Sequence, residues 1–362
     1  MQRLDWIDQG RGLAVLGVVV VHLSQKLTLP FGLGMLANCG QTGVQLFFLL
    51  SAFSMCLSRE RRVANVRSFY LRRFFRIAPM YYVALLIYGF IAIVEGAGEA
   101  YTPLAVAENF SFTHGLDPRH FNNVVPGGWS IATEMGFYLI FPGFISVTER
   151  VSTRSLAISL AVYLAVLGFV EFFFLGKFTY LGENLAGKEF GFVYASLPTQ
   201  LPVFVLGILM FRTRKVQFRA WSMGIGGLSL LVSFFVLNDH MLDTNADALV
   251  YSFAAGFGYF SIAKYAMGRP FQGFFSMWLS SLGKHSYSIY LLHFMGLALT
   301  YRLIERLGVS YNLGILEFCA GLIFSLSVTY FASRFTVRFI EDPFVSLGNR
   351  ISRRWTYSVA AS

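Results

Sequence analysis

Residues 12–23 read GLAVLGVVVVHL, a stretch in which His22 is the only polar side chain. A helix needs about 20 mainly apolar residues to cross a bilayer, and we expect this one to extend over residues 12–29. The whole sequence agrees, because 56% of its 362 residues are apolar and 13% are charged. An ordinary soluble domain is roughly half apolar and a quarter charged. The composition therefore indicates an integral membrane protein and argues against nucleic-acid binding, despite a formal net charge of +10.

Further apolar runs predict an all-α, polytopic membrane protein with about ten transmembrane helices. Residues 1–345 are expected to form the transmembrane domain, and residues 346–362 a short basic cytoplasmic tail. Lys284 and His285 interrupt the first turn of one predicted helix, 281–299. In chain order, the predicted spans are 12–29, 40–58, 77–95, 129–148, 155–176, 192–211, 220–237, 248–266, 281–299 and 312–334.

The basic residues divide unevenly between the two sides of this topology. If the N-terminus lies in the cytoplasm, 23 of the 29 lysines and arginines fall on the cytoplasmic side. Cytoplasmic loops are enriched in these residues, so the count predicts that both termini lie inside a multi-pass protein of the inner (plasma) membrane. The six residues on the other side are Lys26, Arg119, Lys177, Lys188, Arg302 and Arg306.

The sequence lacks the signals of an ATP-driven pump and of a metal site. The absence of a Gly-x-x-x-x-Gly-Lys-Ser/Thr segment argues against an ATP-driven pump. The three cysteines form no Cys-x-x-Cys pair and the histidines show no zinc-ligand spacing, so no metal site is predicted. We interpret His285 and His293 as packing and hydrogen-bonding residues and the histidines of the predicted outside loops as exposed, namely His114, His120 and His240.

The first apolar run carries two ionisable groups, and such groups are costly in a bilayer and often mark a site. Arg11 and His22 are eleven residues apart, which places them about 20° apart on one helical face and about 16 Å apart along the axis. That face would present a cation at the cytoplasmic mouth and an imidazole deep in the membrane. A topology anchor for Arg11 and a buried, hydrogen-bonded histidine for His22 are the alternatives.

A second cluster reads FYLRRFFRIAPMY over residues 69–81, at the cytoplasmic entrance of the third predicted helix. Arg73 and Arg76 are three residues apart and share a helical face, and guanidinium groups bind phosphate in a bidentate manner. Seven arginines within residues 59–76 exceed what topology requires, although a short cytoplasmic loop also collects arginine. Both interpretations stay open.

The third cluster, WSIATEMGFYLIFP over residues 129–142, opens the fourth predicted helix from the outside. Glu134 lies about one and a half turns into the apolar span, with no basic residue four positions away. Removing an unpartnered carboxylate from water is costly, so we expect Glu134 to have a partner or to be protonated. Trp129 and Tyr138 alone are typical of interfacial or packing aromatics.

The order of these segments resembles the acyltransferase 3 family of integral membrane acyltransferases, over nearly the whole chain. The segments that carry the resemblance are IDQGRGLA (7–14) followed by His22, GVQLFFLLSAF (43–53), the arginine run ending at Pro79, Trp129 and Ser130 with Glu134, LGKHSYSIYLLH (282–293) and FIEDPF (339–344).

The resemblance implies an enzyme that transfers an acyl group, usually acetyl from cytoplasmic acetyl-CoA, to a hydroxyl of a carbohydrate or related acceptor at the outer side. It implies no tightly bound cofactor. His22 would be the catalytic general base or a covalent acyl relay, and Glu134 would orient the imidazole or help to bind the acceptor. Donor binding would fall to Arg11, Arg72, Arg73 and Arg76, and acceptor-side candidates are Trp129, Ser130 and Tyr138.

The alternative is a proton-coupled transporter or flippase of a glycan or lipid precursor, with Arg11, His22 and Glu134 as a relay. Such transporters often contain inverted repeats and helices broken near the membrane midplane. The sequence shows no repeat, and its prolines lie mostly at the ends of the predicted spans. These observations favour the enzyme.

Overall fold

The computed structural model describes residues 5–27, 29–60, 65–173, 189–239, 246–267, 269, 272–306 and 314–360. These residues form helices and turns without a strand, which confirms the all-α prediction for this part of the chain. The protein contains two compact units, each built from separate stretches of sequence. The first unit comprises residues 1–47 and 268–344, and the second comprises residues 48–267 and 345–362.

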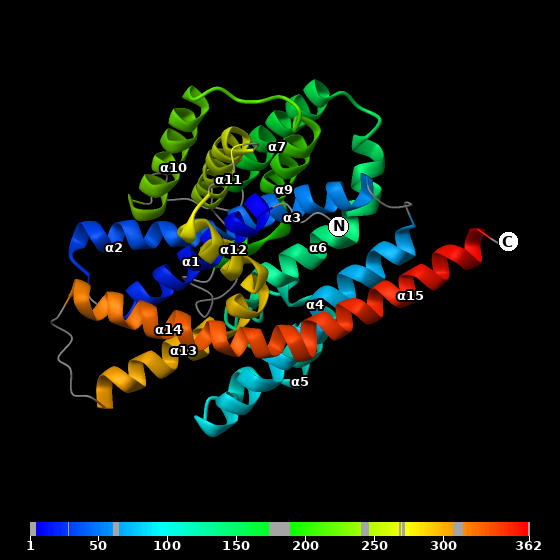
Figure 1. Ribbon diagram of the computed structural model, residues 1–362. Helices are drawn as coiled ribbons and strands as arrows, with labels where there is room; N and C mark the ends of the chain where they lie inside the picture. The colour runs from blue at the N-terminus through cyan, green and yellow to red at the C-terminus, as the bar shows by residue number, and fades with distance from the viewer. Residues whose placement is uncertain are drawn as a thin grey trace. The chain divides into compact units, whose positions relative to one another are not determined.

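In the first unit, the N-terminal helix packs against helices from the end of the chain. Helix α1 (Asp5–Ser24) contacts α12 (Phe274–Lys284), α13 (Ser286–Arg306) and α14 (Ile315–Thr336), and Figure 1 shows α13 and α14 side by side. A Cβ atom added at Gly12 would lie 2.1 Å from the carbonyl oxygen of Leu279. Glycine therefore permits the close approach of α1 and α12, as is common between membrane helices. The unit also contains α2 (Phe31–Asn38), η1 (Cys39–Thr42) and the start of α3 (Gly43–Glu60).

Helix α14 continues beyond the predicted end at residue 334. It passes through a π-helical turn (Val337–Glu341) into α15 (Asp342–Ala360), drawn as one continuous orange-to-red ribbon in Figure 1. Within the π turn, Glu341 is buried and accepts a 2.5 Å hydrogen bond from Ser288 Oγ. Turns of this kind are rare and are frequent at functional sites. Residues 346–360, predicted as a tail, are helical.

The second unit has an aromatic core. The Phe204 ring stacks on Phe48 with 4.6 Å between centroids and on Phe137 with 4.0 Å. From residue 345 onward, α15 packs against α4, where Ser68 Oγ donates to the carbonyl oxygen of Ser352. The unit contains the rest of α3, α4 (Val66–Val94), α5 (Pro103–Ser111), α6 (Gly128–Thr148), α7 (Thr153–Phe173), α8 (Glu189–Ala195), α9 (Leu197–Arg212), α10 (Trp221–Asp239) and α11 (Ala246–Ala266).

Eight helical segments within the described residues are long and apolar enough to cross a membrane. Helices α11 and α13, which correspond to the predicted spans 248–266 and 281–299, are not among the eight. The second of these predicted spans is broken, because α12 ends at Lys284 and α13 begins at Ser286. Conversely, α4 begins at Val66 instead of the predicted residue 77, so the arginine run lies on the helix itself.

Candidate functional site

His22 lies near the C-terminal end of α1, in the first unit, and is half-buried. Its Nδ1 atom is 3.1 Å from Gln25 Oε1. Because an amide oxygen only accepts, this bond places a proton on Nδ1 and leaves the lone pair on Nε2. The ring packs against Phe294 at 4.6 Å and His293 at 5.3 Å between centroids, and Tyr301 donates to the His22 carbonyl oxygen. These contacts hold the imidazole in one orientation.

The neighbouring His293 is fully buried on α13. Its Nδ1 donates to the Tyr290 carbonyl oxygen at 2.5 Å, and its Nε2 has no hydrogen-bond partner within the described residues. Arg11 lies on the same continuous helix as His22, as predicted. The sequence interpretation of His293 as a packing residue missed its contact with His22, because no local pattern links two helices so far apart in the chain.

Glu134, in the second unit, is held by two hydroxyl groups instead of a cation. Its Oε1 atom accepts a 2.5 Å hydrogen bond from Ser51 Oγ and a further hydrogen bond from the Tyr138 hydroxyl one helical turn along α6. The two hydroxyls are 3.2 Å apart. The expected partner of Glu134 is therefore present, and Ser51 is a site residue that the sequence analysis did not single out. Within the described residues, the second carboxylate oxygen makes no hydrogen bond.

The three predicted donor-binding arginines of α4 differ in their surroundings. The Arg73 guanidinium lies 5.4 Å from the Tyr138 ring centroid, and its buried Nε has no hydrogen-bond partner among the described residues. Arg72 instead donates to Ser352 Oγ at 2.5 Å and so joins α4 to α15. Arg76 lies one turn beyond Arg73 on the same face of the helix. The structure thus brings Arg73 into the Glu134 cluster and gives Arg72 a structural bond.

The other two acceptor-side candidates begin α6 and make packing contacts. Trp129 lies 5.0 Å from the Tyr194 ring centroid and 6.4 Å from that of Phe48. Ser130 is buried, and its hydroxyl donates to the Gly127 carbonyl oxygen. Of the three acceptor-side candidates, Tyr138 is the one that touches Glu134.

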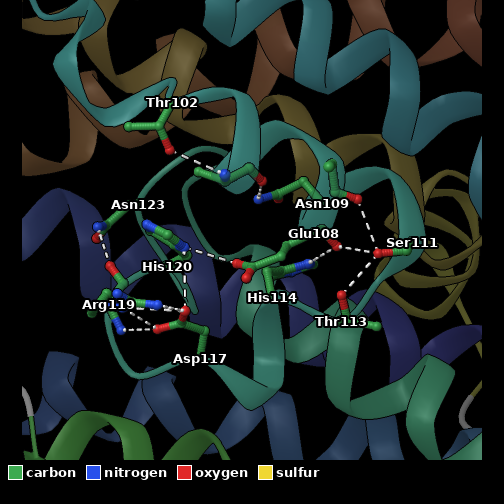
Figure 2. Close-up of polar contacts among 12 residues, drawn as sticks. Thr102, Glu108, Asn109, Ser111, Thr113, His114, Asp117, Arg119, His120 and Asn123 are labelled. Atoms are coloured by element: carbon green, nitrogen blue, oxygen red, sulfur yellow. Dashed lines mark hydrogen bonds and ion pairs between the residues drawn. The ribbon is translucent and has the colours of Figure 1, made fainter.

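The connection between α4 and α6 folds into α5 and a 3₁₀ turn, and Figure 2 shows the polar contacts of Glu108, His114 and His120 within it. His114, expected to be exposed, is buried, and its Nε2 is 3.1 Å from the Gly128 carbonyl oxygen. His120 Nδ1 is 2.8 Å from Glu108 Oε2, and Arg119 forms a two-pronged ion pair with Asp117. The sequence interpretation failed here because it treated as a loop a segment that folds into α5 and a 3₁₀ turn (His114–Leu116).

Glu108, Asp117 and His120 could together hold a metal ion, because their donor atoms lie within 4.8 Å of one another. Their present partners give them a structural role. Hydrogen bonding from Arg119 lowers the pKa of Asp117 to about 2, so this carboxylate stays ionised as the partner of Arg119 at neutral pH. The absence of a metal site remains a prediction.

Acidification should destabilise this connection through His114. Burial lowers the pKa of His114 in the folded protein, whereas the unfolded chain titrates near 6.5. The unfolded state therefore binds more protons, and stability falls as the pH drops through 6.5. We expect Tm to fall between pH 7.5 and pH 5, and His114→Gln to reduce that fall by on the order of 2 °C or more. Thermal unfolding at both pH values measures these falls in Tm, and His120→Gln is the matched control. A pH dependence of Tm in His114→Gln equal to that of the wild type would contradict the prediction.

Comparisons with known proteins agree on one family for this chain. Residues 4–334 match the family described as an acyltransferase domain. The chain is 26% identical over 375 residues to the acyltransferase MdmB of Streptomyces mycarofaciens, covering 96% of this chain and 93% of that protein. It is 26% identical over 376 residues to the O-acetyltransferase OatA of Staphylococcus aureus (strain NCTC 8325 / PS 47), covering 94% of this chain and 57% of that protein. The chain thus spans little more than half of the staphylococcal relative. No solved structure matches it.

Proposed function

The chain belongs to the acyltransferase 3 family and is an O-acyltransferase, and we propose that it moves an acyl group, in the first instance acetyl, from cytoplasmic acyl-CoA to a carbohydrate hydroxyl. The acceptor would be a cell-surface carbohydrate or its lipid-linked precursor. The eight long apolar helical segments among the described residues and the uneven distribution of basic residues support a multi-pass location in the inner membrane. The name of the similar OatA supports acetyl as the group and oxygen as its destination.

The observation that carries the proposal is the environment of His22. An imidazole with its proton bound to Gln25 through Nδ1 presents Nε2 as a base or nucleophile. Packing against Phe294 and His293 limits rotation of the ring, so the lone pair needs little reorganisation before reaction. We place His293 as a positioning residue that keeps the His22 ring in this orientation.

Two routes fit this geometry. In direct transfer, His22 Nε2 takes the proton of the acceptor hydroxyl while the acceptor oxygen attacks the thioester carbonyl, and the CoA sulfur leaves and takes up the proton. In the relay, Nε2 itself attacks the thioester carbonyl and the C–S bond breaks; the CoA thiolate leaves and takes up the proton that Nδ1 gives up, which leaves a neutral acyl-imidazole. The acceptor oxygen later attacks the acyl carbon, the imidazole leaves, and the hydroxyl proton returns to the imidazole. Glu134, with its position fixed by Ser51 and Tyr138, would accept hydrogen bonds from the acceptor.

The purified protein tests the reaction directly. It should release free CoA from acetyl-CoA and place the labelled acetyl group on an added glycan acceptor, whereas heat-denatured protein should do neither. Hydrolysis of acetyl-CoA without transfer to any of a panel of glycans would argue against a carbohydrate acceptor. Transport of an unmodified glycan without acyl transfer would favour the flippase.

Arg73→Ala should raise the KM for the acyl-CoA donor about tenfold and leave Tm nearly unchanged, because a charge-assisted hydrogen bond to phosphate contributes about 1.5–3 kcal/mol. The matched variant Arg72→Ala should instead lower Tm, because Arg72 bonds to Ser352 on α15. Initial rates over a range of donor concentrations, together with thermal unfolding, separate the two effects. Equal KM values for the donor in the wild type and in Arg73→Ala would mean that Arg73 does not bind the donor and serves only as a topology anchor.

A further inference from the structure

The first unit has a polar pocket of about 400 Å³ at the end of α14. His285, Arg334, Arg338 and Asp342 line it, with the exposed rings of Phe335 and Phe339 at its edge. Arg334, Arg338 and Asp342 follow one another at intervals of four residues, from the end of α14 across the π turn. None of the residues assigned to acyl transfer lines this pocket, so Phe339 and Asp342 of the FIEDPF segment, which do line it, need another explanation.

The charged side chains of this pocket lack polar partners within the described part of the chain. The side chains of Arg334, Arg338 and Asp342 form no ion pair or hydrogen bond there, although the Arg338 guanidinium lies 5.7 Å from the Phe339 ring centroid. His285 donates from Nδ1 to the Ser281 carbonyl oxygen, so its Nε2 faces outward as an acceptor in the neutral form. Two guanidinium groups and one carboxylate give the pocket a net formal charge of +2 − 1 = +1.

A second, apolar pocket of about 380 Å³ lies beside the first. It is formed between α12 and α14, and its main apolar walls are Trp278, Leu282, Ile323, Leu326 and Phe331. The linings of the two pockets meet at Tyr330: it lines the apolar pocket, its ring packs edge-to-face at 5.2 Å on His285, which lines the polar one, and its hydroxyl bonds to Ser281 Oγ. Arg334 follows Tyr330 by four residues, or about 6 Å along the helix axis. A ligand can therefore occupy both pockets with a charged end and an apolar end.

We propose that the two neighbouring pockets together bind one anionic phospholipid with a hydroxylated headgroup, of the phosphatidylglycerol type. The single negative charge of a phosphodiester matches the net charge of +1, and two guanidinium groups can bind its oxygens. The carboxylate of Asp342 can accept hydrogen bonds from headgroup hydroxyls, and one acyl chain would enter the apolar pocket beside Tyr330. A zwitterionic lipid would leave the net positive charge uncompensated, and the several phosphates of acyl-CoA would place excess negative charge near Asp342.

This proposal does not depend on the chemistry of His22, because it concerns other residues. The cationic pocket belongs to the group of arginines predicted to lie at the cytoplasmic surface, where anionic lipid headgroups are found. A bound lipid would stabilise the packing of α12 against α14 and the π turn that holds Glu341. The stability of the folded protein would therefore depend on the lipid composition of the membrane.

The test uses the full-length protein in detergent, with native mass spectrometry and thermal unfolding as readouts. Dioleoylphosphatidylglycerol should bind at a concentration at least about tenfold lower than dioleoylphosphatidylethanolamine and should raise Tm. The double variant Arg334→Ala, Arg338→Ala should lose about tenfold or more in affinity, whereas Arg154→Ala, an exposed arginine on α7, should not. Ser327→Trp, which fills the apolar pocket, should weaken lipid binding without affecting the charged residues.

Four results would overturn the proposal. Equal affinity for the two lipids would remove the charge selectivity, and unchanged phosphatidylglycerol binding in the double arginine variant would remove the site. Binding of chain-free glycerophosphoglycerol or inorganic phosphate as strongly as the lipid would assign the pocket to free phosphate. Displacement of phosphatidylglycerol by CoA at equal concentration would assign it to the donor. If the double variant does not fold, Arg338→Gln alone provides the same comparison.

Discussion

Replacing His22 with alanine is expected to lower the rate of acyl transfer about a thousandfold, because a general base or nucleophile in the transition state contributes on the order of 10²–10⁴ in rate. The protein should stay folded, since His22 is only half-buried and the apolar contacts of α1 with α13 through Leu23 and Leu297 remain. Initial rates with labelled acetyl-CoA and a glycan acceptor measure the effect. His22→Gln should fail equally, because an amide fills similar space but cannot take up a proton at neutral pH.

A second measurement separates the two roles of His22. When the wild-type protein is incubated with acetyl-CoA and no acceptor, the relay predicts a label on the His22 peptide, and direct transfer predicts none. Ser24→Ala, on the same turn of α1, is the matched control, because its hydroxyl bonds to the Val21 carbonyl oxygen and has no part in the chemistry. Wild-type rates in His22→Ala would refute both routes, and wild-type Tm must accompany any loss of activity.

Much of the fold can be predicted because membrane spans are local features of the sequence. An apolar run signals a helix regardless of its neighbours, so α6 was located to within one residue at each end, whereas α1 begins at Asp5 and ends at Ser24 instead of the predicted residues 12 and 29. Predictions failed where tertiary contacts or polar residues decide the conformation. His285 breaks a predicted span because its backbone leaves the helical conformation between α12 and α13. The π turn after α14 depends on a buried bond between Ser288 and Glu341, two residues that the sequence does not connect.

The candidate site divides in the same way. Arg11, His22 and Glu134 could be selected from the sequence because ionisable groups stand out in apolar runs. Ser51 could not, since a serine in a membrane helix usually bonds to its own backbone, and its role here depends on α3 meeting α6. Nor could the sequence distinguish Arg72 from its neighbour Arg73, because the difference lies in where Ser352 and Tyr138 are placed.

Glu134→Gln is expected to lower kcat about a hundredfold with a small change in the KM for the donor. The substitution keeps an oxygen that can accept from Ser51 and Tyr138, so the side chain should remain in place while the negative charge is lost. A hydrogen bond to a charged group contributes about 1.5–3 kcal/mol, and a catalytic carboxylate acts mainly through its charge in the transition state. Steady-state rates against donor and acceptor concentration give the two parameters separately.

Ser51→Ala and Tyr138→Phe determine whether the position of Glu134 also matters. Each substitution removes one hydroxyl donor and leaves the charge of Glu134, so each should reduce kcat about tenfold. If the two hydroxyls act on the same oxygen, the double variant should lose less than the product of the two single losses. Wild-type kcat in Glu134→Gln, with reduced kcat in Ser51→Ala, would mean that this cluster supports packing of α3 against α6. Loss of kcat in Glu134→Gln with wild-type rates in both hydroxyl variants would mean that the charge acts without this precise placement. We expect a larger loss of kcat in Glu134→Gln than in Ser51→Ala or Tyr138→Phe. That order would mean that the reaction needs both the charge of Glu134 and the two hydrogen bonds that hold it in place.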